Sequence, residues 1–289
     1  GADYISKPFD KGEIIARVQN QLKIQRLTRE LIEKNRELTE KQRSIDEDLR
    51  AAGGIQQSLL PKKYPDIKCL DISWKFIPSN LIGGDIFNFL QLDENNVGFY
   101  MIDVSGHGVP PALVTVSVSQ TLQTVNKNVT TRNTDTAYVS EITSPRKVLE
   151  TLDAEYPISR FEKYFTIIYA VINIEEGSIT YSNAAHPPPV LLHTNGSHEL
   201  LDAGGTIIGM GGILPFEEEK KKLSNGDKVI FYTDGVTEFQ NNNDEFYGES
   251  RFIETLKKNR DKNVADIIDA VFASIKEFGG NTEFQDDIS

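Results

Sequence analysis

An apolar stretch that ends in a single carboxylate constrains the fold more than any other feature of the chain. Residues 97–102 read VGFYMI, which is typical of a buried strand. Asp103 follows directly and precedes a run of small residues. Pro110 and Pro111 then open a helix, because a first-turn proline lacks only an N–H that would be unpaired there anyway. The pattern predicts a strand that delivers an acid to the rim of a sheet.

Composition limits the possible partners. The 289 residues suffice for one large domain or two modest ones, and 38% of them are hydrophobic. A net charge of −12 disfavours nucleic acid or an anionic membrane surface as the main partner.

Cys69 is the only cysteine, which excludes a disulfide framework and fits a reducing compartment. No signal peptide or apolar run of roughly 18 residues is evident, so we expect a cytoplasmic protein.

A long helix is expected near the N-terminus. Residues 1–9 read as a strand end and a turn, Asp10 supplies an N-cap with Glu13 three residues on, and no proline follows until Pro61. One position of a seven-residue repeat is apolar along this helix, but the second position that a coiled coil needs is poor in apolar residues. We therefore expect a weak coiled coil that pairs two chains, or else a helix packed on its own domain. The heptad stripe itself consists of Ile24, Leu31, Leu38, Ile45, Ala52 and Leu59.

Beyond residue 65, short apolar runs alternate with turns. Helices are expected at about 110–125 and 145–156, with a third helical zone at about 249–277 and a loop at 126–143. Many short strands with grouped helices indicate an α+β fold with antiparallel sheets. The expected strands cover 69–77, 86–92, 97–104, 165–174, 178–182, 189–193 and 228–233.

Four acidic positions share one context, since each lies where an apolar strand or a loop gives way to small residues. Acids brought together repel one another, so such a site needs protons or cations between them. Oxygen ligands suit the hard ions Mg²⁺ and Mn²⁺. Taken singly, an Asp-Gly pair after a strand is most often a turn, so the spacing alone only hints at a metal site. The positions are Asp85, Asp103, Asp234 and the pair Asp286-Asp287.

Six blocks of the sequence resemble one family. They follow the order, and roughly the spacing, of the bacterial stage II sporulation protein E-type phosphatases, a branch of the metal-dependent PP2C-like Ser/Thr phosphatases. The likeness covers about residues 52–289, and residues 52–61 are similar to the helix that leads into that domain. The blocks are GGDIFN (83–88), MIDVSGHGVPPAL (101–113), YFTIIYAVI (164–172), SNAAHPPPVLL (182–192), GDKVIFYTDGVTE (226–238) and DDIS (286–289).

A second resemblance concerns the N-terminal end. GADYISKPF and the helix after it are similar to the last strand, Lys-Pro turn and final helix of a two-component receiver domain. Together the resemblances imply a receiver remnant at 1–23, a helical or coiled-coil linker at 24–61 and a phosphatase domain at 62–289 with a truncated last strand. The phosphatase would then be the output of a response regulator.

The family resemblance also implies a fold and a ligand set. The expected fold is a two-layer antiparallel β-sandwich flanked by helices, with two Mn²⁺ or Mg²⁺ ions at one end. Asp103 would bridge both ions, and the carbonyl of Val104 would contact one of them. Asp85 would bind on that side largely through water, while Asp234 and Asp286 would hold the other ion. Asp85, Asp103 and Asp234 are the expected catalytic residues.

The same resemblance implies the reaction. A metal-bridging hydroxide would hydrolyse phosphoserine or phosphothreonine on a signalling protein, and the family precedent for the substrate is an anti-anti-sigma factor with a STAS domain. The alternatives are a catalytically weak pseudophosphatase that binds a phosphoprotein, and a scaffold whose function lies in the helix. No arginine that would bind the phosphate is evident.

Four further residues lie within the family-like blocks or next to an expected ligand, and they are weaker candidates for a role in catalysis. His107 could be a general acid, although a structural role is favoured. His186, before three prolines, is expected to cap a turn, and Glu238 to make a hydrogen bond within its loop. Asp287 is expected to face away from the side that Asp286 takes, because adjacent residues of a strand alternate.

Two positions depart from the family pattern. Asn88 stands where a second acid is usual, and Ala185 stands where glycine usually precedes the histidine. The first change would weaken an outer contact of the metal site, and the second would narrow a tight turn.

Overall fold

The computed structural model describes residues 10–61, 67, 69–79, 81–106, 108–127, 142–280, 282 and 284–289. The chain divides into two compact units, residues 1–51 and residues 52–289. The strand end and turn expected at residues 1–9, the candidate His107 and most of the loop expected at 126–143 lie outside the described residues. Within the described residues, no helix combines the length and the apolar character needed to cross a membrane.

The expected N-terminal helix is α1 (Lys11–Gln57). The carboxylate of Asp10 accepts a hydrogen bond from the Gly12 N–H at 2.6 Å, which confirms the expected N-cap. Ion pairs between residues one turn apart, such as Arg26–Glu30, further stabilise the helix. The apolar stripe is open to solvent, since Ile24, Leu31, Leu38 and Ile45 are 57%, 68%, 65% and 52% exposed.

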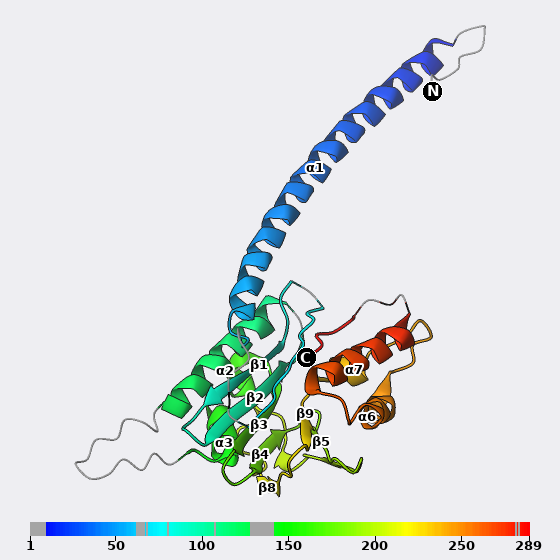
Figure 1. The fold of residues 1–289 in the computed structure, drawn as a ribbon. Helices are drawn as coiled ribbons and strands as arrows, with labels where there is room; N and C mark the ends of the chain where they lie inside the picture. Colours follow the sequence, from blue (N-terminus) through cyan, green and yellow to red (C-terminus); the bar gives the residue numbers. More distant parts are fainter. Residues whose placement is uncertain are drawn as a thin grey trace. The chain divides into compact units, whose positions relative to one another are not determined.

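Two β-sheets form the centre of the unit 52–289 (Figure 1). The larger sheet has the strand order β1-β2-β3-β4-β7, with β8 also paired to β4, and its pairs are antiparallel except β4–β7. The smaller, antiparallel sheet has the order β6-β5-β9. The strands are β1 (Asp85–Gln91), β2 (Asn96–Val104), β3 (Phe165–Asn173), β4 (Ser178–Ala184), β5 (Val190–Leu192), β6 (His198–Leu200), β7 (Gly204–Gly205), β8 (Glu219–Lys222) and β9 (Lys228–Ile230).

Three apolar clusters hold this unit together in four layers. Alternate residues of β2 face opposite sides of the sheet, so Tyr100 packs toward α2 and α3 while Phe99 packs toward the second sheet. The ring of Phe99 lies 4.1 Å from that of Phe231 beside β9. Helices α6 and α7 cover the other face of the small sheet. The helices are α2 (Val109–Lys127), α3 (Pro145–Glu155), α4 (Ile158–Phe161), α5 (Asp234–Thr237), α6 (Gly248–Lys258) and α7 (Val264–Gly279).

The layers confirm the expected α+β sandwich flanked by helices, with several local differences. The segment 69–77 is not a strand, because it pairs only through an isolated bridge between Ile77 and Ile288. The helical zone 249–277 is two helices, since Asn263 accepts a hydrogen bond from the Asp266 N–H and starts α7 anew. The short elements β6, β7, β8, α4 and α5 were not expected.

Candidate metal centre

Asp85 and Asp103 are direct partners in the antiparallel ladder of β1 and β2. Their side chains therefore lie on the same face of the sheet, at its rim. Asp85 is 4% exposed, and Asp103 is half-buried. Like charges directly opposite each other destabilise a sheet, so this pair requires a proton or a cation between the carboxylates.

A cradle of oxygen atoms surrounds Gly84, the residue before Asp85. A β-carbon on Gly84 would lie 2.7 Å from the carbonyl oxygen of Val104, 3.2 Å from that of Gly106 and 3.5 Å from Oδ1 of Asp103. Only glycine leaves this space open. Two backbone oxygens and one carboxylate oxygen thus converge where the resemblance implies that Asp103 and Val104 act together.

The C-terminal segment closes the site from the other side. The backbones of Ile288 and Ile77 exchange two hydrogen bonds of 2.9 Å. Next to this bridge, Oγ of Ser289 donates to Oδ2 of Asp85 at 3.0 Å, and the Ser289 N–H donates to Oγ1 of Thr233 at 3.2 Å. The segment therefore ties the start of β1 to the residue before Asp234.

The neighbours Asp286 and Asp287 occupy different environments, as alternation suggested. Asp287 is buried and accepts hydrogen bonds from the N–H and Oγ of Ser79 at 2.8 and 3.1 Å and from the Asp85 N–H at 3.3 Å. Asp286 is exposed, and its Oδ1 accepts a bond from the Asp287 N–H. Asp287 thus positions the backbone of Asp85, whereas Asp286 has lone pairs open to solvent.

Asp234 opens the short helix α5 rather than a simple turn. Gly235 lies against the backbone of Asp287 so closely that a β-carbon would collide with it. The expected loop hydrogen bond of Glu238 involves its N–H, which donates to the Asp234 carbonyl at 2.7 Å. The exposed side chain of Glu238 acts electrostatically on both Asp103 and Asp234, a role that the sequence reading missed.

We call Asp85, Asp103, Asp234, Glu238, Asp286 and Asp287 the acidic cluster. Burial, followed by the charges of Asp103 and Asp287, raises the pKa of Asp85 well above its usual value. Burial also raises the pKa of Asp103 to about 7, with further contributions from the charges of Asp234 and the other acids except Asp85. The pKa of Asp234 rises to about 6, mainly through burial and the charge of Asp286. The structure therefore places these carboxylates close enough for their charges to affect one another.

The acidic cluster suits hard divalent ions in its chemistry. The atoms that could bind a metal are carboxylate and backbone oxygens, and the cradle at Gly84 leaves space beside them. A bound cation would lower the pKa values that burial and repulsion raise. Across the described part of the chain, however, no three His, Cys, Asp or Glu side chains are already arranged to hold one ion. Backbone oxygens and water must therefore complete any ligand set here.

His186 lies behind the acidic cluster and has a structural role. Its Nδ1 makes a hydrogen bond of 2.9 Å with Oγ1 of Thr166, the residue paired with Asp103 on β3. Its N–H donates to Oδ1 of Asn183 at 2.7 Å, which closes the turn after β4. Burial lowers the pKa of His186 to about 3, so the imidazole is neutral. Ala185 within this turn has a φ of +54°, a value that favours glycine.

Asn88 points away from the acidic cluster. Its Nδ2 donates to the Leu59 carbonyl at 2.7 Å, and its Oδ1 accepts a bond from the Phe89 N–H at 2.8 Å. An ionised acid here could not donate to Leu59, so asparagine links β1 to the segment just after α1 within the same unit.

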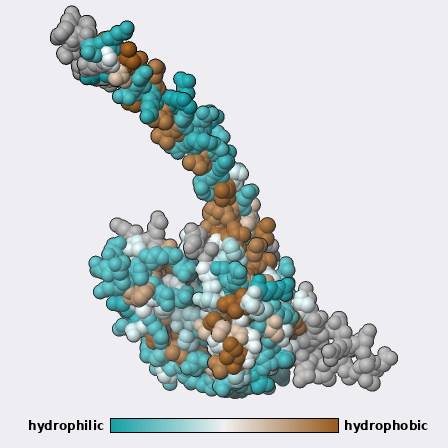
Figure 2. Space-filling model, turned by 180° about the vertical axis from the view of Figure 1, so that it is seen from behind, coloured by the Kyte–Doolittle hydropathy of each residue, from teal (hydrophilic) through white to brown (hydrophobic). Residues whose placement is uncertain are grey.

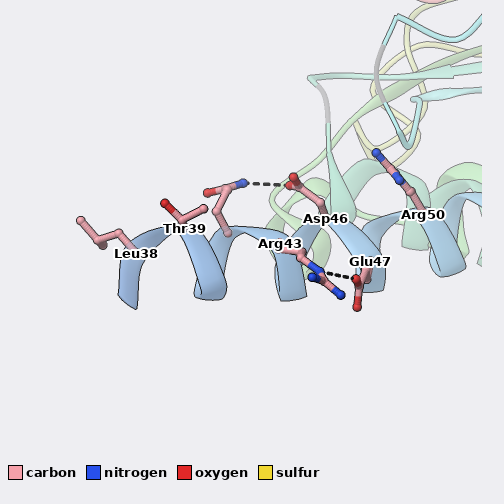
Figure 3. A pocket seen from close by; sticks show the side chains of 7 residues that line it. Leu38, Thr39, Arg43, Asp46, Glu47 and Arg50 are labelled. Atoms are coloured by element: carbon pink, nitrogen blue, oxygen red, sulfur yellow. Dashed lines mark hydrogen bonds and ion pairs between the residues drawn. The ribbon is translucent and has the colours of Figure 1, made fainter. Parts of the chain in front are cut away.

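A separate depression of about 620 Å³ runs along α1 (Figure 3). Its lining belongs to one helix, and the dashed lines mark the Gln42–Asp46 hydrogen bond and the Arg43–Glu47 ion pair. It is a surface furrow without a catalytic constellation. Its lining residues are Leu38, Thr39, Gln42, Arg43, Asp46, Glu47 and Arg50.

The four-layer fold is PP2C-like. The SiaA-PP2C domain of Pseudomonas aeruginosa superimposes with a TM-score of 0.70 at 19% identity, covering 86% of this chain and 95% of that one. Residues 93–289 match the model of the family described as Stage II sporulation protein E (SpoIIE), and the chain belongs to this family.

Two curated relatives come from Bacillus subtilis (strain 168). Phosphoserine phosphatase RsbP is 27% identical over 235 residues, which are 79% of this chain and 53% of RsbP. Phosphoserine phosphatase RsbU is 25% identical over 199 residues, which are 68% of this chain and 55% of RsbU. The chain thus spans about half the length of the curated relatives that it matches.

Proposed function

We propose that this chain is a metal-dependent protein Ser/Thr phosphatase. The observation that carries the proposal is the direct pairing of Asp85 with Asp103 beside the oxygen cradle at Gly84. Two acids in register cost stability, and a pair of bound cations would offset that cost. The names of the curated relatives, both phosphoserine phosphatases, support the same reaction.

The acidic cluster would hold two Mn²⁺ or Mg²⁺ ions. Asp103, Asp85, Asp234, Asp286 and the Val104 carbonyl are the groups that would hold these ions. When bound, such ions activate water for attack on phosphorus and offset the charge of the phosphate oxygens. Asp287 and Ser289 would position Asp85 and would not bind the ions themselves. Asp287 accepts a hydrogen bond from the Asp85 N–H, and Ser289 donates one to the Asp85 carboxylate.

The chain's own residues would position the reactants. A protein with a net charge of −12 repels a phosphate dianion, so the substrate can approach only where that charge is compensated. Neutral His186 would keep β3 and the turn after β4 in place behind Asp103. No nucleophilic side chain is required, since water is the attacking group.

Hydrolysis of p-nitrophenyl phosphate with added Mn²⁺ tests the activity. Asp103→Asn and Asp234→Asn should each lower kcat/KM at least about a hundredfold, because each would remove a charge that holds the ions. Asp269→Asn is the matched control, since Asp269 is an exposed aspartate of α7 that pairs with Lys75. Full activity in both site variants would refute the proposed ligand set.

The proposed substrate is a phosphoserine or phosphothreonine of a signalling protein, such as a STAS-domain anti-anti-sigma factor. The names of both relatives, which call them phosphoserine phosphatases, support this choice. A phosphorylated STAS protein should release inorganic phosphate in the presence of Mn²⁺, whereas a phosphotyrosine peptide of similar length should not. Binding without release would instead indicate a pseudophosphatase.

We further propose that α1 pairs two chains and that the chain is the output of a receiver domain. The pairing is supported by the exposed stripe through Leu31 and Leu38, which a second helix would cover. The receiver proposal is supported by the sequence likeness of GADYISKPF and the helix after it to the end of a receiver domain. Sedimentation of the full chain with Leu31→Lys and Leu38→Lys should show a monomer if the unchanged chain is a dimer. Ile32→Lys is the control, because Ile32 is 65% exposed but lies off the stripe. A monomeric unchanged chain would contradict the pairing.

A further inference from the structure

Lys163 lies beside the loop that follows Asp103. It belongs to the connection between α4 and β3, and the next residue, Tyr164, accepts a hydrogen bond from the Ser105 N–H at 3.0 Å. The ladder of β2 and β3 continues this contact, with Phe165 opposite Val104. The segment of Lys163 is therefore fixed by backbone bonds to the segment that carries Asp103.

The ammonium group of Lys163 reaches over this loop. A β-carbon on Gly106 would lie 3.3 Å from Nζ of Lys163. Gly106 has a φ of +88°, and its carbonyl oxygen is one of the three oxygens around Gly84. One residue thus separates the ammonium from the oxygen cradle of the acidic cluster.

Lys163 is half-buried and has no partner among the residues that the structure describes. Other lysines of this unit are paired, such as Lys220 with Glu176 and Lys221 with Glu219. No described carboxylate of the acidic cluster forms an ion pair with Lys163. Its charge is therefore available to an anion that arrives from outside.

We propose that Lys163 contacts the phosphate group of the substrate, an inference that rests on the proposed phosphatase function. An ammonium cannot serve as a metal ligand, but as a point charge it binds phosphate oxygens well. The cation lies at the rim, where a phosphoryl group above the oxygen cradle would present its oxygens. Lys163 would supply the phosphate contact for which no arginine is evident in the sequence.

The test compares Lys163→Ala, Lys163→Arg and the control Lys262→Ala in the full chain with Mn²⁺. Lys262 is an exposed lysine between α6 and α7, and its removal changes the net charge equally. Two quantities are measured: the KM for p-nitrophenyl phosphate, and the dissociation constant of inorganic phosphate from titration calorimetry. Lys163→Ala should raise both about tenfold or more, because the variant loses a charge-assisted hydrogen bond to phosphate, and tenfold corresponds to about 1.4 kcal/mol. Lys163→Arg should stay within about threefold of the unchanged protein.

Each outcome decides the proposal. Equal KM and phosphate affinity in Lys163→Ala and Lys262→Ala would overturn it. A fall in kcat and melting temperature with unchanged phosphate affinity, not rescued by arginine, would also overturn it and would assign Lys163 to loop support. If the unchanged protein binds Mn²⁺ and phosphate but hydrolyses nothing, the phosphatase proposal fails, while the phosphate affinities of the variants still decide the role of Lys163.

Discussion

The carboxylates of Asp85 and Asp103 face each other across β1 and β2 as paired residues of one antiparallel ladder. Unpaired acids at such positions cost stability, and burial makes that cost larger. Two glycines allow oxygen atoms to come close to this pair. Gly84 leaves room for the oxygens of Val104, Gly106 and Asp103, and Gly83 leaves room for the carboxylate of Asp287. The sheet rim therefore brings negative charge together, and protons or bound cations would offset its cost.

Asp103→Asn should stabilise the metal-free protein. The folded protein raises the pKa of Asp103 from 3.8 to about 7, so ionised Asp103 opposes folding at neutral pH. Removing the charge should raise the free energy of unfolding by about 2–4 kcal/mol, since each pKa unit corresponds to about 1.4 kcal/mol. Urea denaturation in EDTA measures the gain. In Mn²⁺ the order should reverse, and a variant that is less stable in EDTA would contradict the prediction.

The metal-free protein should lose stability as the pH rises from about 4 to 8. Asp103 and Asp234 have raised pKa values of about 7 and 6, so the folded state keeps protons that the unfolded state has released. The stabilisation is complete below the unfolded pKa and is lost as the pH passes the folded one. Hydrogen bonding to Asp227 raises the pKa of His193, which acts in the same direction. Melting temperatures of Asp103→Asn and of the unchanged protein, measured across this pH range, separate the contribution of the acidic cluster from that of His193. The melting temperature of the variant should fall less steeply as the pH rises.

Gly84→Ala should weaken metal binding. The added β-carbon would lie 2.7 Å from the Val104 carbonyl oxygen and would push it away from the cradle. We expect a loss of about 1–3 kcal/mol in the free energy of unfolding from overpacking, and at least about tenfold weaker Mn²⁺ binding by calorimetry. Gly54→Ala is the control, since nothing lies within 4 Å of a β-carbon there and helix propensity predicts a gain of about 1 kcal/mol. Unchanged Mn²⁺ affinity in Gly84→Ala would argue against the cradle.

Ala185→Gly should stabilise the protein. The φ of +54° at Ala185 costs an L-residue roughly 1–2 kcal/mol, and the greater chain entropy of unfolded glycine returns part of that. A net gain of up to about 1 kcal/mol is expected from thermal denaturation, with activity unchanged. A loss of stability would mean that the methyl group of Ala185 packs favourably enough to outweigh the strain.

The sequence predicted the central strands well because they are long and their residues alternate or are wholly apolar. Residues 97–104 and 165–174 correspond closely to β2 and β3. The sequence did not predict β8, whose four residues EKKK are exposed or half-buried and pair only along the edge of β4. Short edge strands carry little apolar signal, so only tertiary pairing defines them.

The site was predictable in its members but not in its geometry. The positions of Asp85, Asp103 and Asp234 followed from strand ends and from the family resemblance. The register that places Asp85 opposite Asp103, and the proximity of Lys163 to Gly106, depend on long-range packing. Lys163 also has no distinctive context, since it stands between a glutamate and a tyrosine in an unremarkable connection.

Crystals of the chain soaked in Mn²⁺ provide the most direct measurement of the central idea, that the acidic cluster binds divalent ions. Anomalous difference maps should show manganese beside Asp103 and the Val104 carbonyl, with ligand distances of about 2.0–2.3 Å. Manganese bound elsewhere, or no manganese at the rim between Asp85, Asp103 and Asp234, would contradict it.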